Sequence, residues 1–259
     1  MFLNFKSKHT FFYYRREIKL FRYFLLLILI TSCTTTHIKR EIIYQNGQRV
    51  YSEEDVKYIS GKAAVDRDSK EPITGILKKY HRAGKISEEI EFKNGVIDGI
   101  AKGFYENGNL EYIMSGYYHG SYDTVIRYYE DGVMKSKANH RKNELHGKLL
   151  LYYENSQLQG DFNYVEGKED GDFKVYYRHG ELYSNGTFKN GKLNGTTTYY
   201  REDGEMCLNA HYEKDKLISI TRVDGTHLNK EEVKEWREDN WSYCHIMSKK
   251  KNNCNVKNK

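Results

Sequence analysis

The sequence predicts an all-β fold in which six β-hairpin repeats of 24 residues form an elongated antiparallel sheet that ends in a short C-terminal helix. A fixed period predicts the repeats, because four landmark positions recur every 24 residues between residues 75 and 218, as is typical of repeat architectures. The composition predicts the strands, because 24 tyrosines, 21 glycines and one proline in 259 residues suit strands joined by tight turns.

Four landmark positions define each repeat. The first is a glycine or, once, an aspartate: Gly75, Gly99, Asp123, Gly147, Gly171 and Gly195. An aromatic residue follows five positions later: Tyr80, Phe104, Tyr128, Tyr152, Tyr176 and Tyr200. Next come a turn residue (Gly84, Gly108, Gly132, Ser156, Gly180, Gly204) and a large apolar residue (Ile86, Leu110, Met134, Leu158, Leu182, Met206). We expect equivalent residues to stack into ladders along the sheet.

Asn-Gly and Asp-Gly dipeptides separate the expected strands. They occur at Asn94-Gly95, Asn107-Gly108, Asp131-Gly132, Asn190-Gly191 and Asp203-Gly204. Because a type I′ turn needs positive φ at both central residues, these dipeptides favour two-residue hairpin turns. Each repeat is therefore expected to be one β-hairpin, and successive hairpins are expected to form a meander.

A second aromatic residue often follows the landmark aromatic residue. It is tyrosine at Tyr105, Tyr129, Tyr153 and Tyr177. Neighbouring residues of a strand point to opposite faces, so both faces of the sheet carry tyrosine. Tyrosine offers a large amphipathic contact area at low entropy cost, which makes these four residues a candidate interaction surface. The alternative is that they only stabilise the sheet as a ladder.

Residues 1–32 have the pattern of a lipoprotein signal peptide. A basic stretch precedes the apolar run 24–30, which is too short for a transmembrane helix. The run leads into Ile30-Thr31-Ser32-Cys33, which resembles the bacterial lipoprotein box. The resemblance implies that Cys33 takes a diacylglyceryl thioether and becomes the new N-terminus. The alternative is a stray cysteine behind an ordinary signal or a short anchor.

This leader determines the expected location and most of the charge. A lipid-anchored chain belongs to the bacterial cell envelope, and Thr34 after the cysteine implies the outer membrane, if the cell has one, on its periplasmic or cell-surface face. Residues 1–32 carry a net charge of +5, and the whole chain carries +6. The remainder therefore carries about +1, which creates no field that attracts nucleic acid.

Three further cysteines follow the leader. Because Cys207, Cys244 and Cys254 are odd in number, at least one of them stays unpaired or pairs between molecules. Cys244 and Cys254 are close enough in sequence to bridge in an oxidising compartment. The alternative is that all three are incidental thiols.

The segment ahead of the repeats, residues 33–74, is expected to form a linker and an irregular N-terminal hairpin cap. Residues 41–50 predict a hairpin, and residues 57–65 predict one further strand ahead of the polar turn 66–71. An open sheet needs such protection at its edge.

The segment after the repeats, residues 219–259, is expected to form a capping helix and a basic tail. Asn229 followed by Glu232 forms a capping box, and a hydrophobic staple joins Leu228 to Val233.

This helix is expected over residues 229–243, with Val233, Trp236 and Trp241 on one face. The two tryptophans either pack over the last hairpin or anchor a partner.

The repeat resembles the MORN-type repeat, and more closely its bacterial variant. Residues 99–110 and 188–195 match the variant's order of glycine, paired aromatic residues and Asn-Gly turns. Arrays of this variant are known in bacteria as the YwqK family of antitoxins, and residues 71–75 are similar to the entry of that family's first full repeat. The resemblance covers about residues 44–218 and implies the fold together with neutralisation of a toxin by direct binding.

The sequence contains no catalytic constellation and no CxxC pair. Its histidines fall at non-equivalent repeat positions: His81, His119, His140, His179 and His211. We therefore expect no enzyme activity, metal or cofactor. The leading hypothesis is a membrane-anchored binding or scaffold module for an unidentified protein or envelope glycan, and the alternatives are an antitoxin or immunity protein and a phospholipid-binding sheet.

Overall fold

The computed structural model describes residues 42–59, 63–116 and 121–238. Every described strand and the described α-helix belong to one compact unit, Ile43–Lys259. Cys33 lies in the other unit, Met1–Ile42, and is outside the described residues, as are Trp241, Cys244 and Cys254. Within the described ranges, no helix is long and apolar enough to cross a membrane.

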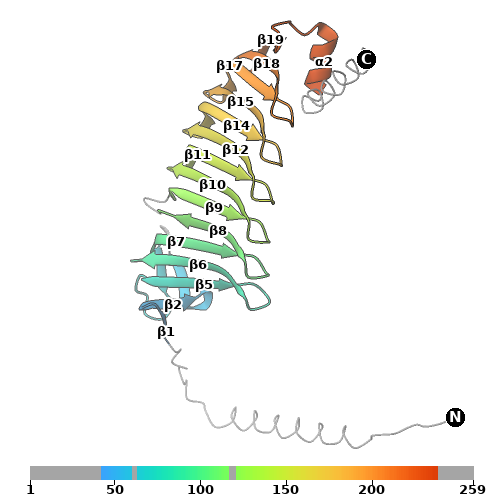
Figure 1. The fold of residues 1–259 in the computed structure, drawn as a ribbon. Coiled ribbons are helices and arrows are strands. Elements are labelled where there is room, and N and C mark those ends of the chain that lie inside the picture. Colours follow the sequence, from blue (N-terminus) through green and yellow to red (C-terminus); the bar gives the residue numbers. More distant parts are fainter. Residues whose placement is uncertain (1–41, 60–62, 117–120, 239–259) are drawn as a thin grey trace, which may run out of the picture. The chain divides into compact units, whose positions relative to one another are not determined.

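Six β-hairpins follow one another in chain order, which confirms the predicted fold (Figure 1). They are β5 (Gly75–Tyr80) with β6 (Ile86–Lys93), β7 (Val96–Phe104) with β8 (Leu110–Ser115), β9 (Thr124–Tyr128) with β10 (Met134–Arg141), β11 (Glu144–Tyr152) with β12 (Leu158–Val165), β14 (Gly171–Tyr176) with β15 (Leu182–Lys189), and β17 (Gly195–Tyr200) with β18 (Met206–Glu213). The short strands β13 (Lys168–Glu169) and β16 (Lys192–Leu193) lie between hairpins, and β19 (Lys216–Arg222) follows the last one.

The sheet contains 17 strands, and from β5 onward each main strand pairs antiparallel with the next along the chain. The landmark aromatic residue of each hairpin lies directly opposite the landmark apolar residue, as in the pairs Tyr80–Ile86 and Tyr152–Leu158. Such cross-strand pairs of aromatic and apolar side chains stabilise a sheet.

Two kinds of turn alternate along the sheet, whereas the sequence predicted type I′ turns throughout. At Asn94-Gly95 and Asn190-Gly191 both residues have positive φ, with the asparagines at 50° and 53°, as type I′ turns require. These turns are at the edge where one hairpin passes into the next.

Within the hairpins, the type I′ prediction is wrong. At Asn107-Gly108 only the glycine has positive φ, at 97°, and its N–H donates to the Tyr105 carbonyl at 2.9 Å. Asp131-Gly132 and Asp203-Gly204 behave in the same way. These loops are one residue longer, so a type I turn is followed by a left-handed glycine at a β-bulge. A dipeptide alone does not reveal loop length, which explains the error.

Side-chain hydrogen bonds tie each hairpin to the next at the loop edge of the sheet. The second tyrosine of a repeat donates its hydroxyl to the carbonyl of the landmark aromatic residue 23 positions later. The bonds are Tyr105 to Tyr128 (2.8 Å), Tyr129 to Tyr152 (2.8 Å), Tyr153 to Tyr176 (2.7 Å) and Tyr177 to Tyr200 (2.7 Å). In the first repeat the Nε2 atom of His81 lies 2.8 Å from the Phe104 carbonyl and takes the same place.

Backbone hydrogen bonds join the repeats at the opposite edge. The N–H of a type I′ turn residue donates to a carbonyl 22 positions earlier: Gly95 to Ile73 (2.8 Å), Gly167 to Leu145 (2.9 Å), Gly191 to Glu169 (2.8 Å) and Asp215 to Leu193 (2.9 Å). Successive repeats are therefore fixed to one another at both edges as well as along their strands.

The N-terminal cap is built from β1 (Ile43–Gln45), β2 (Gln48–Ser52), a 3₁₀ turn (Glu53–Asp55), β3 (Val56–Ile59) and β4 (Ala63–Asp66). The predicted first hairpin is present as β1–β2, and β2 pairs in parallel with β5. The predicted single strand over 57–65 is wrong, because β3 and β4 form a separate two-stranded sheet. The pattern of apolar residues over 57–65 is compatible with one strand, and it did not indicate that the chain reverses direction between β3 and β4.

The C-terminal cap consists of α2 (Lys230–Glu238), which is packed against the last hairpins (Figure 1). The capping box is confirmed, since Asn229 N–H donates to Glu232 Oε2 and Glu232 N–H donates to Asn229 Oδ1, both at 3.0 Å. Leu228 and Val233 both pack in the adjoining core, as the staple predicts. The remainder of the predicted helix, residues 239–243, lies outside the described residues.

Replacing Tyr153 by phenylalanine tests the contribution of the inter-repeat bond. The change removes the 2.7 Å hydrogen bond to the Tyr176 carbonyl and keeps the ring. We expect the free energy of unfolding in urea to fall by about 0.5–1.5 kcal/mol. Tyr152→Phe is the matched control, because the described residues offer its hydroxyl no hydrogen-bond partner. Equal losses for the two variants would contradict the assignment.

Candidate functional site

One face of the sheet carries a continuous row of small and apolar side chains. Cross-strand pairing gives the row in order: Leu77, Ile90, Ala101, Met114, Val125, Ala138, Leu149 and Phe162, continued by Phe173, Gly186, Thr197, Ala210 and Ile220. We call the face that carries this row the inner face. Residues directly opposite each other in a sheet share a face, so the row runs across all six hairpins.

Both ends of the inner face are covered. At the N-terminal end, Leu77 and Phe92 pack with Tyr51, Val56 and Ile73 of the cap. At the C-terminal end, Ala210 and Ile220 belong to a core that includes Trp236 of α2. Trp236 is 4% exposed, and its ring meets Tyr199 edge-on with the ring centres 5.5 Å apart.

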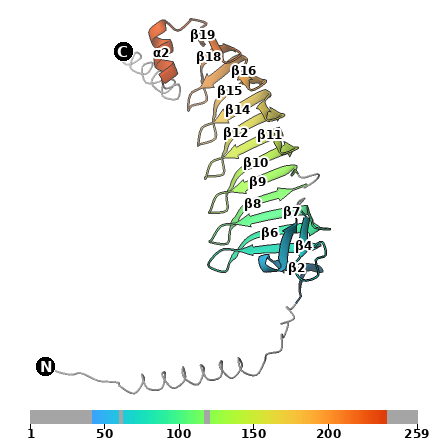
Figure 2. The same ribbon diagram turned by 180° about the vertical axis from the view of Figure 1, so that it is seen from behind.

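The described residues leave the middle of the inner face uncovered. No described helix or strand lies over β8–β12 in either view of the fold (Figures 1 and 2). We call this stretch the central patch, and it is lined by Tyr112, Met114, Val125, Arg127, Leu149 and Leu151. Its apolar members are half-buried by their neighbours in the sheet alone. Uncovered apolar surface of this kind is typical of interaction sites.

A second inner-face row places a cation in the central patch. Arg127 on β9 lies opposite Tyr112 on β8 and Ser136 on β10, and Leu151 lies opposite Ser136 on the other side. The Arg127 side chain is exposed. Tyr112 lies flat on Gly103, where an added Cβ would fall 2.1 Å from its ring, and it donates to Glu88 Oε1 at 2.9 Å.

The four predicted interaction tyrosines lie at the loop edge of this same face. Tyr177 is 3% exposed and belongs to the C-terminal core, whereas Tyr105, Tyr129 and Tyr153 are half-buried. All four hydroxyls donate to backbone carbonyls. Only the ring surfaces of the three half-buried residues remain for a partner, so their role in recognition stays a prediction. The predicted anchor Trp236 is buried, and Trp241 lies outside the described residues.

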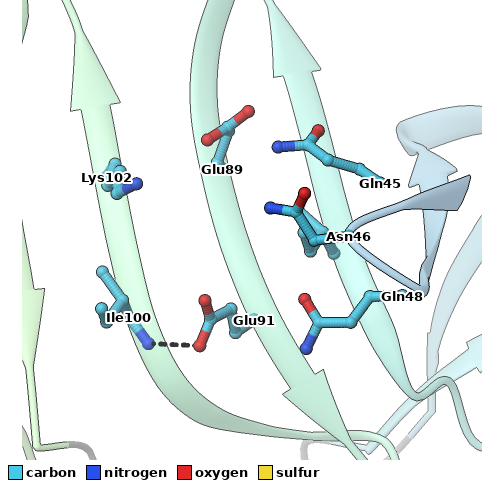
Figure 3. Close-up of a pocket in the computed structure, with 8 residues that line it drawn as sticks. Gln45, Asn46, Gln48, Glu89, Glu91, Ile100 and Lys102 are labelled. Carbon is cyan, nitrogen blue, oxygen red and sulfur yellow. Dashed lines mark hydrogen bonds between the residues drawn. The ribbon is translucent and has the colours of Figure 1, made fainter.

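The opposite face holds a small polar recess beside the N-terminal cap. It has a volume of about 110 Å³ and is lined by Gln45, Asn46, Gln48, Ile76, Glu89, Glu91, Ile100 and Lys102. Figure 3 shows the amides of the β1–β2 hairpin directed toward the carboxylates of β6. Glu91 Oε2 accepts from the Ile100 N–H at 3.0 Å, and Glu89 pairs with Lys78 at 3.0 Å. Such a mixture of donors and acceptors suits a neutral, hydrogen-bonding ligand.

The sequence analysis missed Arg127 and this recess. Arg127 precedes a landmark aromatic residue, where the other repeats hold Lys79, Gly103, Leu151, Val175 and Tyr199, so a comparison of repeats would have identified Lys79 and Arg127 as the two cations at this position. The recess has no such signal, because it forms only when the β1–β2 hairpin packs beside β5–β7.

Two of the scattered histidines, His81 and His179, and the cysteine Cys207 have structural roles. His179 Nε2 lies 3.0 Å from the Glu202 carbonyl, so it links repeats at the loop edge, as His81 does. Cys207 is disulfide-bonded, and its partner lies outside the described residues. Among the described residues, no group of three or more His, Cys, Asp or Glu side chains is placed to hold a metal ion.

The family model described as MORN repeat variant matches five segments of the chain: residues 73–94, 97–115, 124–143, 145–166 and 169–190. These segments contain the first five hairpins. The sixth repeat is not matched, although β17–β18 forms the same hairpin. No curated protein sequence matches the chain significantly. The chain thus carries MORN-type repeats, as the resemblance implied.

Alkaline unfolding tests the burial of the inner-face tyrosines. Burial, reinforced by Glu202 and Asp203, raises the pKa of Tyr177 to about 12. An unfolded tyrosine loses its proton near about pH 10, so between these values only the unfolded state has released the proton. Stability is therefore full below about pH 10 and falls, by up to about 1.4 kcal/mol per pH unit for this group, as the pH rises toward 12.

The measurement is the urea midpoint of wild type and Tyr177→Phe across this alkaline range. The phenylalanine variant is expected to start less stable and to lose less stability as the pH rises. Parallel curves for the two proteins would contradict the burial assignment.

Proposed function

We propose that the chain is a non-catalytic binding module held at the bacterial cell envelope by a lipid on Cys33. The observation that carries the binding role is the central patch, an apolar stretch between two capped ends of one sheet that no described element covers. MORN repeats are often binding or scaffold modules, which agrees with this role.

The bonding between repeats supports a rigid scaffold. Hydrogen bonds at both sheet edges, such as Tyr153 to Tyr176 and Gly167 to Leu145, hold each hairpin against the next. A surface that is already ordered loses little conformational entropy when a partner binds.

The export pattern and the Cys207 disulfide support an envelope location. Disulfides form and persist in oxidising compartments and are rare in the cytosol. Cys33, the proposed anchor, lies ten positions before the start of β1 in the sequence. The near-neutral charge beyond residue 32 favours a protein or a glycan as the partner over nucleic acid.

A neutralising role is the second candidate. The five MORN-variant matches and the resemblance to the YwqK family favour an antitoxin or immunity protein that binds a toxin directly. Such a protein uses the same kind of exposed binding surface. It predicts a toxin gene beside this one, and deletion that harms cells only when that toxin is present.

Metabolic labelling with a palmitate analogue tests the anchor. We expect label on the wild type in the membrane fraction and no label on Cys33→Ala, because only the thiol of residue 33 can form the thioether. Ser32→Ala, which keeps a small residue before the cysteine, is the control that retains the label. An unlabelled, soluble wild-type protein would refute the anchor and favour the antitoxin reading.

Thiol labelling of protein from the cells tests the compartment. Cys207 is expected to resist maleimide until a reductant is added, because a disulfide engages its sulfur. Mass spectrometry of the digested protein reports this residue by itself. A Cys207 thiol that reacts fully without reductant would argue against an oxidising compartment.

A further inference from the structure

The central patch contains cations that no acidic side chain neutralises. Arg127 is exposed, and within the described ranges no carboxylate forms an ion pair with it. Lys135 occupies the bulge of the neighbouring strand β10, is also exposed, and holds its Nζ 5.3 Å from the centre of the Tyr129 ring. Arg127 and Lys135 thus place two positive charges beside the apolar side chains of the central patch, whereas the equivalent bulge position on β8 holds Glu111.

Among the described residues, the carboxylates around the central patch form no ion pair with these two cations. Glu88 is paired with Lys79 at 2.6 Å and also accepts from the Tyr112 hydroxyl. Burial raises the pKa of the Tyr105 hydroxyl, and the nearby carboxylates of Glu111 and Glu130 raise it further, whereas Arg127 lowers it. Within the described residues, no ion pair joins Arg127 to Glu111 or Glu130.

Several large side chains lie beside Arg127 on the inner face. Tyr112 flanks it on β8, Leu151 follows beyond Ser136, and Val125 precedes it by two residues on the same face. Arginine at the centre of an apolar patch is typical of the residues that dominate protein interfaces, because its planar fork binds a carboxylate in two places while its stem packs. Two cations are too few for a polyanion surface, whose binding depends on many neutralised phosphates.

We propose that the central patch docks a segment of a partner protein that presents a carboxylate between apolar side chains, with Arg127 as the group that pairs with the carboxylate. This inference rests on the proposed role as a binding module and names the class of its partner. Lys135 supplies a second positive charge at the rim, and Leu149 and Leu151 receive the apolar side chains.

Selection from a random peptide library displayed on phage tests the inference. The target is residues 33–259 with Cys33→Ser, which contain the whole compact unit Ile43–Lys259. We expect the enriched peptides to combine acidic with aliphatic or aromatic residues. Synthetic copies are then measured by titration against wild type and Arg127→Glu, with Lys174→Glu as the control, because Lys174 is an exposed lysine on the opposite face.

Arg127→Glu is expected to weaken binding of the acidic peptides at least about tenfold, and Lys174→Glu to leave it within about twofold. A peptide with lysine in place of its acid is expected to prefer Arg127→Glu over wild type. Circular dichroism of each variant checks that it is folded. We expect both variants to fold, because Arg127 and Lys174 are exposed.

Three outcomes would overturn the inference: enriched peptides without acids, equal binding to Arg127→Glu and wild type, or no enrichment at all. Peptides that bind independently of Arg127 would leave the binding module intact and remove only this docking mode. The lipid label on Cys33 is measured separately, so failure of the anchor and failure of the docking mode are distinguishable.

Discussion

The hydrogen bond from a tyrosine hydroxyl to a carbonyl of the next repeat is the side-chain interaction that recurs from the second repeat to the sixth. Strands β8–β12 form a single layer of sheet, and no described second layer covers their faces. A two-stranded hairpin is marginal in water by itself. Bonds such as Tyr129 to Tyr152 and Tyr153 to Tyr176 join neighbouring hairpins beyond the ladder of the strands and so supply stability that a buried core would otherwise give.

Glycine residues on the inner face also help to stabilise the single-layered sheet. Tyr112 lies over Gly103, and Phe162 lies over Gly160, where an added Cβ would fall 2.4 Å from the ring. Each ring thereby shields its apolar surface against the backbone of the sheet. Because the array buries its aromatic rings in this way, it leaves a flat central patch that a partner can cover, and the two caps confine that patch to the middle repeats.

The same construction explains why tyrosine content by itself is a poor guide to the binding surface. The repeated tyrosines maintain the sheet, and all four predicted interaction tyrosines use their hydroxyls on the backbone. Residues that differ from one repeat to another, such as Arg127 and Lys135, do not form these hydrogen bonds between repeats. In a repeat protein the common positions build the scaffold, and departures from the common pattern are the places to seek recognition.

The sequence alone determined the repeat, the hairpins and the C-terminal capping box, because each depends on residues close together in the chain, such as Asn94-Gly95 or Asn229 and Glu232. Tertiary structure decided which face is covered, where the tyrosine hydroxyls donate and how β3 and β4 fold back. These features depend on contacts between residues about one repeat apart, or between the caps and the sheet. The periodicity of the sequence does not reveal which of these distant residues are in contact. The central patch belongs to this second class, since it is defined by where the two caps end.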